Sequence, residues 1–178
     1  MKTFLALLII FFATLQTVAA DTPHWRQATE KELASVIPDR APVEKERIET
    51  EFRTASGVTD GRGKFIAGVV MITAGYSAEG KYSHFFITQV PIKMGDVTLR
   101  PGEYVFGYRR VDNESLRVMF YTAANGELVG AVKARVESKR GPIRSLLITP
   151  PGGGEELSGA KSIIQIGRFF FEYTLLAE

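Results

Sequence analysis

Apolar and polar residues alternate along most of the chain after residue 63, as they do in strands that bury one face. The apolar and β-branched runs cover residues 64–74, 84–93, 96–99, 103–111, 116–122, 128–136, 143–149 and 162–175. Gly, Pro, Asn or Asp separates the runs, and no helical pattern of ten or more residues lies between them. Parallel strands need such connecting helices. The pattern therefore predicts an all-β fold, a single antiparallel β-sandwich or small barrel of about eight strands.

A charged segment precedes these runs, and its first part predicts a short helix. Thr29 and Glu32 have the spacing of a capping box, in which the two side chains satisfy free amide groups at a helix start. Pro38 clashes with a continued helical backbone, so this helix ends before it.

A second helix is predicted between Pro42 and Gly57. Ile48, Phe52 and Ala55 recur there at helical spacing and give one narrow apolar stripe. The glycines of residues 57–63 indicate a linker. Residues 21–63 are therefore predicted to be a charged helical leader and linker, and residues 64–178 an antiparallel β domain.

Turn residues set the expected pairing of the central strands. Two connections are possible between the strands at residues 116–122 and 128–136. A three-residue loop, with Gly126 in the left-handed region and a bulge, places apolar residues opposite one another, whereas a two-residue turn would place charged residues opposite apolar ones. The pairs expected from the three-residue loop are Val118 with Val132, Leu116 with Ala134 and Phe120 with Gly130. Across residues 112–115, Val111 is expected opposite Leu116. Pro101 and Gly102 have the order of a type II turn.

These registers give the three central strands one apolar face and one unusual face. The unusual face is aromatic at one end and basic at the other, and its predicted site residues are Arg110, Arg117, Lys133, Tyr121 and Tyr108. The three cations fall in one cross-strand row, and like charges directly opposite each other destabilise a sheet.

Three interpretations of this row remain open. In the first interpretation the face is exposed to solvent, and the long aliphatic parts of the Arg and Lys side chains cover aromatic rings while the charged groups stay in water. Alternatively, the leader helix lies across it and supplies glutamates Glu44, Glu46, Glu49 or Glu51 as counter-charges. In the third interpretation the face is a ligand platform, where aromatics hold an apolar or sugar-like body and cations hold an acidic group.

The last apolar run, residues 162–175, is apolar on both faces if it forms one strand. Phe169, Phe171 and Tyr173 then lie on one face, and Ile164, Ile166 and Phe170 on the other. Such a strand is buried between layers or closes a barrel. An exposed Phe169-Phe170-Phe171 edge would pair with another chain, so the run is expected to be covered or used in a homodimer.

Residues 1–20 have the three-part layout of a secretory signal peptide. Lys2 supplies a positive charge, residues 4–13 are an apolar run, and small residues precede the cleavage site expected after Ala20. The run is too short to span a bilayer, so no transmembrane segment is expected in the mature chain. The protein is predicted to be exported to a periplasm or the cell exterior.

Composition narrows the chemistry further. The 178 residues include 22 Lys plus Arg and 20 Asp plus Glu, a net charge of +2 that does not indicate a nucleic-acid partner. The absence of cysteine excludes disulfides, thiol nucleophiles and zinc ribbons, and two histidines, His24 and His84, leave little for a metal site. No cofactor is indicated. Residues 93–144 hold ten bases and six acids, which favours anionic partners.

One segment resembles a known pattern. Residues 95–104 are similar to the strand–turn–strand signature of several secreted bacterial β-domains, including prealbumin-like modules. The resemblance implies a β-sandwich and no activity.

The leading hypothesis is an exported, non-enzymatic β-domain that binds an acidic or amphipathic small molecule or envelope component through the aromatic and basic face. A first alternative is a small barrel that carries a lipophilic ligand. The second is an envelope hydrolase, for which Ser83, His84 and the acids Asp60, Asp96 and Asp112 are the candidate residues.

Overall fold

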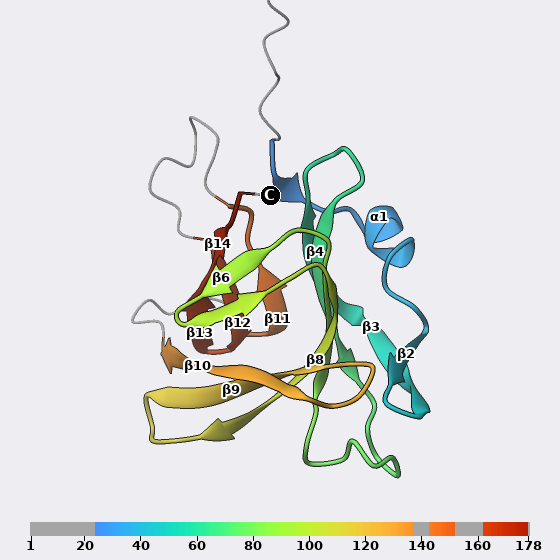
Figure 1. Cartoon of the computed structure of the whole chain (residues 1–178), viewed down its shortest axis with the longest axis vertical. Helices are drawn as coiled ribbons and strands as arrows, with labels where there is room; N and C mark the ends of the chain where they lie inside the picture. The colour runs from blue at the N-terminus through green and yellow to red at the C-terminus, as the bar shows by residue number, and fades with distance from the viewer. Residues whose placement is uncertain (1–23, 137–142, 152–161, 178) are drawn as a thin grey trace, which may run out of the picture.

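The computed structural model of the protein describes residues 24–136, 143–151 and 162–177, which are nearly all β (Figure 1). The strands are β1 (Arg26–Gln27), β2 (Arg40–Val43), β3 (Glu46–Thr59), β4 (Phe65–Met71), β5 (His84–Thr88), β6 (Ile92–Met94), β7 (Val97–Leu99), β8 (Gly102–Arg110), β9 (Ser115–Thr122), β10 (Leu128–Val136), β11 (Arg144–Ile148), β12 (Ile163–Gly167), β13 (Phe169–Glu172) and β14 (Thr174–Leu175). One short helix, α1 (Glu30–Ala34), accompanies them. The predicted signal peptide lies outside the described residues, among which no helix is long and apolar enough to cross a membrane.

Most strands belong to one large antiparallel sheet that curls into a half-barrel, which confirms the prediction of an all-β antiparallel fold. Its strand order is β1-β3-β4-β5-β8-β9-β10-β13-β12-β11, with β2 paired to β3. The curl brings β11 back against β3, where the backbone N–H of Ile148 donates to the hydroxyl of Ser56 at 2.9 Å. Strands β14, β6 and β7 form a separate small sheet, which Figure 1 shows in front of β12 and β13.

Buried apolar side chains form two clusters, one on each side of the large sheet. The inner cluster fills the concave side and joins β8, β9, β12 and β13 to the hairpin β6–β7. The outer cluster lies between the convex side of β3, β4, β5 and β8 and the segments that cover it, which are α1, β2 and residues 72–83. Adjacent residues of β5 show the division, because Phe86 belongs to the inner cluster and Phe85 to the outer one.

The leader segment agrees with the prediction in its first part only. Thr29 and Glu32 form the capping box at the start of α1. The second predicted helix is wrong, because residues 46–59 form β3, which pairs with β4 in the large sheet. Charged residues at positions 47, 49, 51 and 53 alternate with Ile48, Thr50 and Phe52, so the true period is two. The predicted leader is therefore part of the β structure.

The run of residues 162–175 is also not a single strand. A turn at Gly167, with φ of 60°, folds it into the hairpin β12–β13. Ile164 then pairs with Phe171, so both side chains face the inner cluster and not opposite sides. Strand β13 lies between β10 and β12 in the sheet order, so it is not an edge strand.

Turn chemistry is confirmed at one site and wrong at another. Gly126 has φ of 69°, a bulge lies between Leu128 and Gly130, and all three predicted pairs between β9 and β10 are present. Gly102 has no positive φ and begins β8, so the type II turn predicted for Pro101-Gly102 does not form.

The inner cluster should be most sensitive at Phe120. Its ring lies 5.1 Å from Phe106, 5.9 Å from Phe86 and 6.0 Å from Phe171, measured between centroids. Phe120→Ala should lower the free energy of unfolding by about 3–5 kcal/mol, because it removes a fully buried ring and leaves a cavity. Urea unfolding measures the change. The exposed control Val129→Ala should stay within about 0.5 kcal/mol, and a loss below about 1 kcal/mol for Phe120→Ala would contradict this packing.

Candidate functional site

The basic row of the central strands exists, but one of its members differs from the prediction. Arg110, not Val111, lies opposite Leu116, so strand β8 is shifted by one residue against β9. A shift of one residue moves every side chain of a strand to the other face. Arg109 therefore takes the position predicted for Arg110, opposite Arg117, and Arg117 lies opposite Lys133.

We call Arg109, Arg117 and Lys133 the basic row. All three side chains are exposed on the convex side of β8, β9 and β10, and directly paired residues have their Cβ atoms about 5 Å apart. Within the part of the chain that the structure describes, none of the three has a carboxylate at ion-pair distance. Lys133 only adds to a lowering of the pKa of Asp112 whose main cause is the hydrogen bond from Ser115.

The interpretation in which leader glutamates neutralise the row is wrong. Glu44 accepts hydrogen bonds from Tyr82 and Lys81, and Glu51 pairs with Arg53. The remaining two glutamates, Glu46 and Glu49, bind Ser77 and Tyr76. Three of the four glutamates therefore tie β3 and the turn before it to residues 72–83, while Glu51 stays paired within β3, and none lies on a strand of the row.

Tyr121 lies on the same convex face as the row, at its apolar end. Met119 separates it from Arg117, and the Tyr121 hydroxyl donates to the Met119 sulfur at 3.7 Å. The Tyr121 ring meets the Tyr82 ring edge-on at 5.1 Å, and the Lys81 ammonium lies 5.9 Å from its centroid. The face therefore combines Tyr121 with the basic row, but the aromatic residues of β8 that were predicted to share it lie on the concave side.

Tyr108 and Arg110 do not belong to this face. The shift places both on the concave side, near the open end of the curl, where Tyr108 stays 44% exposed. The Arg110 guanidinium lies 5.5 Å from the centroid of Phe169, a cation–π arrangement. A depression of about 430 Å³ opens here, lined by Arg110, Asn113, Val136, Ile143, Gly167, Arg168 and Phe169.

His84, the residue on which the hydrolase interpretation depends, is buried. Its ring stacks on Phe106 at 4.5 Å, Nδ1 lies 2.8 Å from the Ser83 hydroxyl, and Nε2 lies 3.4 Å from the Ser145 carbonyl. A carbonyl only accepts, so Nε2 carries the proton and Nδ1 accepts from Ser83. None of the described carboxylates hydrogen-bonds to His84, so the Ser83–His84 pair has no acid partner there.

Burial also makes His84 a weak base. Desolvation lowers its pKa from 6.5 to about 4, although the hydrogen bond to Ser145 opposes this shift. A general base works best with a pKa near the working pH. The geometry therefore fits a structural histidine that connects β5 to β11.

The interior that a lipophilic ligand would occupy holds protein side chains. The hairpin β6–β7 places Ile92, Met94, Val97 and Leu99 in the inner cluster, where all four are buried. They pack with Phe120 and Phe171 from the large sheet.

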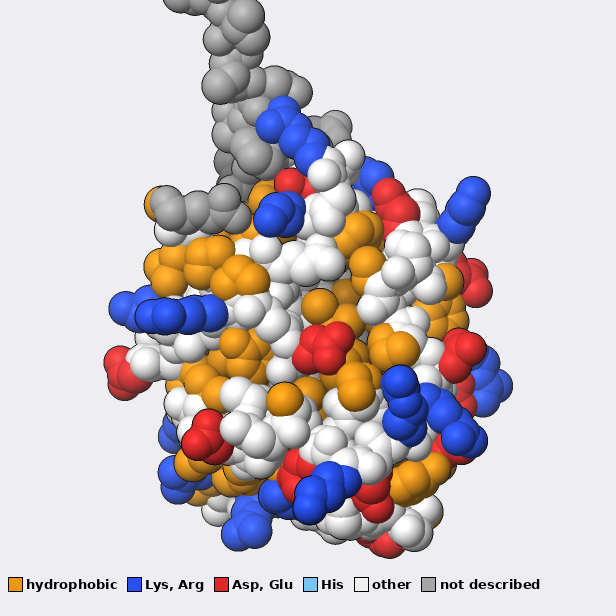
Figure 2. Space-filling view, turned by 45° about the vertical axis from the view of Figure 1, so that its right-hand side comes forward, with side chains coloured by type: hydrophobic (Ala, Val, Ile, Leu, Met, Phe, Trp, Pro, Cys, Tyr) orange, Lys and Arg blue, Asp and Glu red, His pale blue; other side chains and the backbone are white. Residues whose placement is uncertain are grey.

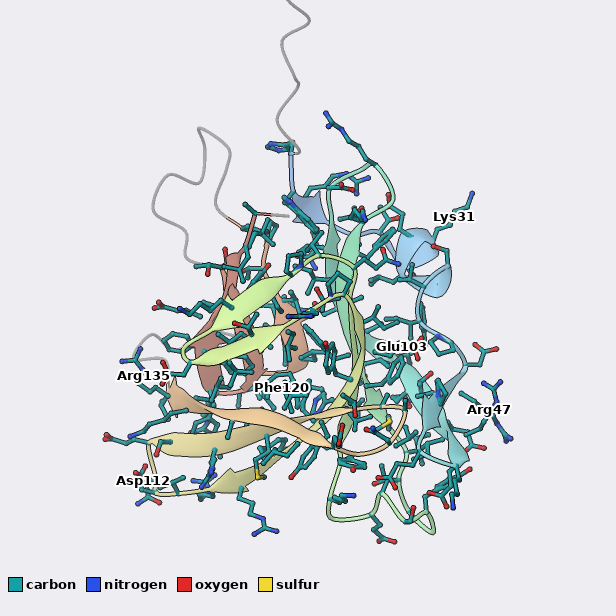
Figure 3. The ribbon with its side chains drawn as sticks, viewed as in Figure 1. Lys31, Arg47, Glu103, Asp112, Phe120 and Arg135 are labelled. Atoms are coloured by element: carbon teal, nitrogen blue, oxygen red, sulfur yellow. The ribbon has the colours of Figure 1, made fainter. Side chains whose placement is uncertain are left out.

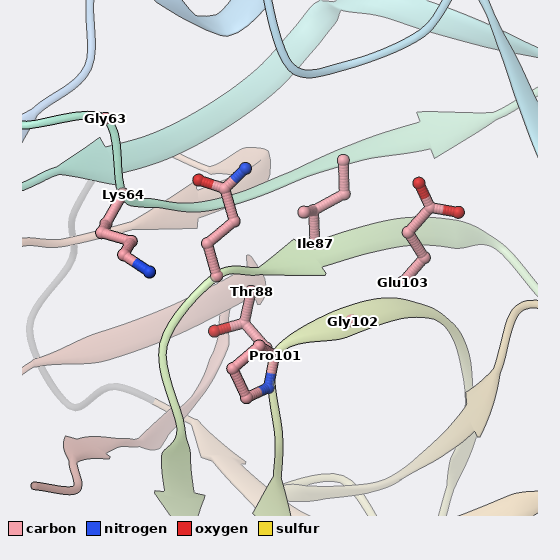
Figure 4. Close-up of a pocket in the computed structure, with 8 residues that line it drawn as sticks. Gly63, Lys64, Ile87, Thr88, Pro101, Gly102 and Glu103 are labelled. Atoms are coloured by element: carbon pink, nitrogen blue, oxygen red, sulfur yellow. The ribbon is translucent and has the colours of Figure 1, made fainter. Parts of the chain in front are cut away.

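A groove of about 520 Å³ lies at the other end of β8 (Figure 4). Its charged side chains, Lys64 and Glu103, lie at opposite ends in this view, so they do not converge on one ligand group. The side-chain carbonyl of Gln89, also in its lining, already accepts the backbone N–H of Phe65. The groove offers a weaker site than the basic row.

The state of His84 should make stability depend on pH. Between pH 6.5 and about 4 the unfolded chain binds a proton at this position and the folded protein does not. The free energy of unfolding should therefore fall as the pH is lowered through this window, by about 3 kcal/mol in all. His84→Gln retains an N–H donor for Ser145 but cannot titrate, so it should lose this component of the dependence.

Urea unfolding at several pH values between 7 and 4 measures the effect. His24→Gln is the matched control, since His24 is exposed and its variant should keep the wild-type slope. Equal slopes for wild type and His84→Gln would refute the assigned role.

Comparisons with known proteins give no relative. No known protein family matches the chain, and neither a curated protein nor a solved structure is significantly similar to it. What the convex face binds must therefore be inferred from its own residues.

Proposed function

We propose that the protein is an exported, non-enzymatic β-domain that binds a partner with several negative groups on the convex face of β8, β9 and β10. The basic row carries this proposal. Three exposed cations occupy directly paired positions on adjacent strands, with no ion-pair partner among the described residues. Export rests on the pattern of residues 1–20.

A bound anion would relieve an unfavourable arrangement in the sheet. Like charges directly opposite each other destabilise paired strands, and a ligand with several negative groups would convert each repulsion into an attraction. Because the row spans three strands about 4.8 Å apart, it suits an extended or branched anion better than a single carboxylate.

Other parts of the surface are less suited to this task. Figure 2 presents a face on which acidic and basic side chains lie beside each other along the right-hand and lower edges. On β2 and β3, Arg40 pairs with Glu49 and Arg53 with Glu51. Cations that are already paired attract an external anion less strongly.

The apolar end of the face adds a second element of recognition. Met119 and Ala131 are half-buried between the row and Tyr121, and together they form an apolar floor beside the cations. An amphipathic anion would bury part of its apolar body on this floor. A purely polar anion would use the basic row alone.

Reversal of two charges of the row tests the proposal. Arg117→Glu combined with Lys133→Glu should weaken the binding of inorganic polyphosphate by about tenfold or more, because two attractive charges become repulsive. Isothermal titration calorimetry at low salt measures the affinity, and added salt should weaken wild-type binding.

The matched control changes the same net charge elsewhere. Arg47 and Lys93 are exposed on β3 and β6, so Arg47→Glu with Lys93→Glu should leave the affinity within about threefold of wild type through long-range effects alone. Equal losses in both double variants would show that only net charge matters, and the basic row would not be a site.

A further inference from the structure

We propose that the anionic partner is a membrane surface rich in anionic lipids, on which the protein docks with the end formed by the turn between β8 and β9. This inference rests on the proposed function, because it uses the same basic row. It adds a class of partner and an orientation.

Cations gather around this turn on both sides of the sheet. The basic row and Arg135, which lies opposite Ser115, occupy the convex side. Arg110 and Arg168 line the depression on the concave side. Figure 3 shows Arg135 and Asp112 on the same flank of the molecule, opposite the flank that carries Arg47. The curl thus directs six cations toward one end.

The acids at this end cancel only part of that charge. Asp112 and Glu114 lie in the turn itself, and both Asp112 oxygens are engaged there, one by the backbone N–H of Glu114 and one by the Ser115 hydroxyl. These hydrogen bonds stabilise the turn. Among the described residues, six cations and two acids lie at this end, which leaves an excess of positive charge.

Exposed apolar side chains occur at the same end. Val111, next to Arg110 in the turn, is 62% exposed, and Ile143, which lines the same depression as Arg110, is 65% exposed. Tyr108 is the third exposed large apolar residue here. A soluble polyanion would leave these side chains in water, whereas a bilayer interface takes up apolar side chains and attracts the cations around them.

This combination selects a membrane over other anionic partners. Cations near an anionic leaflet each contribute to binding, and apolar side chains add to it only if they enter the headgroup region. Exposed aliphatic side chains beside cations, such as Ile143 beside Arg110 and Arg168, match that interface. The charge complementarity and the exposed aliphatic residues therefore point to one occupant.

Vesicle cosedimentation tests the inference with the chain from residue 21, the expected mature form. We expect binding to vesicles of phosphatidylcholine with one third phosphatidylglycerol, and little binding to phosphatidylcholine alone. Val111→Asp with Ile143→Asp should lower the partition coefficient on anionic vesicles by about tenfold or more. Both positions are exposed, so the variant should fold, which circular dichroism checks.

A matched control uses exposed apolar residues away from the binding face. Ile72, just after β4, is 50% exposed and Leu176, just after β14, is 36% exposed, so Ile72→Asp with Leu176→Asp should leave vesicle binding within about threefold of wild type. Both double variants add two negative charges, which separates insertion of the turn from a change in net charge. Equal loss in the two would overturn the inference.

The outcomes separate this inference from the proposed function. Val111→Asp with Ile143→Asp should retain polyphosphate affinity to within about threefold, while Arg117→Glu with Lys133→Glu should lose both polyphosphate and vesicles. If polyphosphate binds through the row but anionic vesicles do not bind, the membrane proposal fails and the proposed function stands. If glycerol phosphate, at the same concentration as the lipid headgroups, competes with vesicles for the protein, a free anion is the ligand. That result would also overturn the membrane proposal. Polyphosphate binding that survives charge reversal would refute the proposed function.

Discussion

The four-residue connection between β8 and β9 determines the chemistry of the whole convex face. The backbone N–H groups of Val111 and Asp112 donate to the Ser115 carbonyl, and the Asp112 carboxylate accepts from Glu114 and Ser115. These bonds fix Arg110 opposite Leu116. Because side chains alternate between faces, this one register sends Arg109 outward to join the basic row and Arg110 inward over Phe169.

The sequence contains enough information to predict the register of β9 against β10, but not the register of β8 against β9. Asn125-Gly126 provides a residue that adopts positive φ easily, and the bulge that follows keeps Val118 against Val132. Residues 111–115 contain no glycine, and their geometry depends on side-chain hydrogen bonds from Asp112. The number of loop residues could not be derived from apolar pattern alone, so the site was predicted with Arg110 in place of Arg109.

The errors in the leader and the last run have a different origin. At residues 46–59 the apolar positions fit a helical period, but the charges at alternate positions fit a strand, and tertiary pairing with β4 decides in favour of the strand. In the last run, Gly167 permits a turn with positive φ, and the gain is that Ile164 and Phe171 both enter the inner cluster. Both outcomes are hairpins between strands adjacent in the chain, and the apolar pattern of one segment alone does not reveal that it folds back on its neighbour.

Curling of the sheet connects the fold to the proposed docking end. In a flat sheet Arg109 and Arg110 would act on opposite faces as independent groups. In the curled sheet the hairpin β6–β7 fills the concave side, and Arg110 and Tyr108, at the end of β8, lie at its rim close to the turn. Adjacent residues on opposite faces therefore serve one end of the molecule.

The basic row contributes little to the stability of the fold that presents it. Its three cations have no ion pair among the described residues, whereas the inner cluster, with Phe120 at its centre, supplies the packing beneath them. In a chain without cysteine, that packing must hold the sheet without disulfides. Charge reversal in the row should relieve repulsion between strands and leave the core intact, so any loss of binding can be assigned to the surface itself.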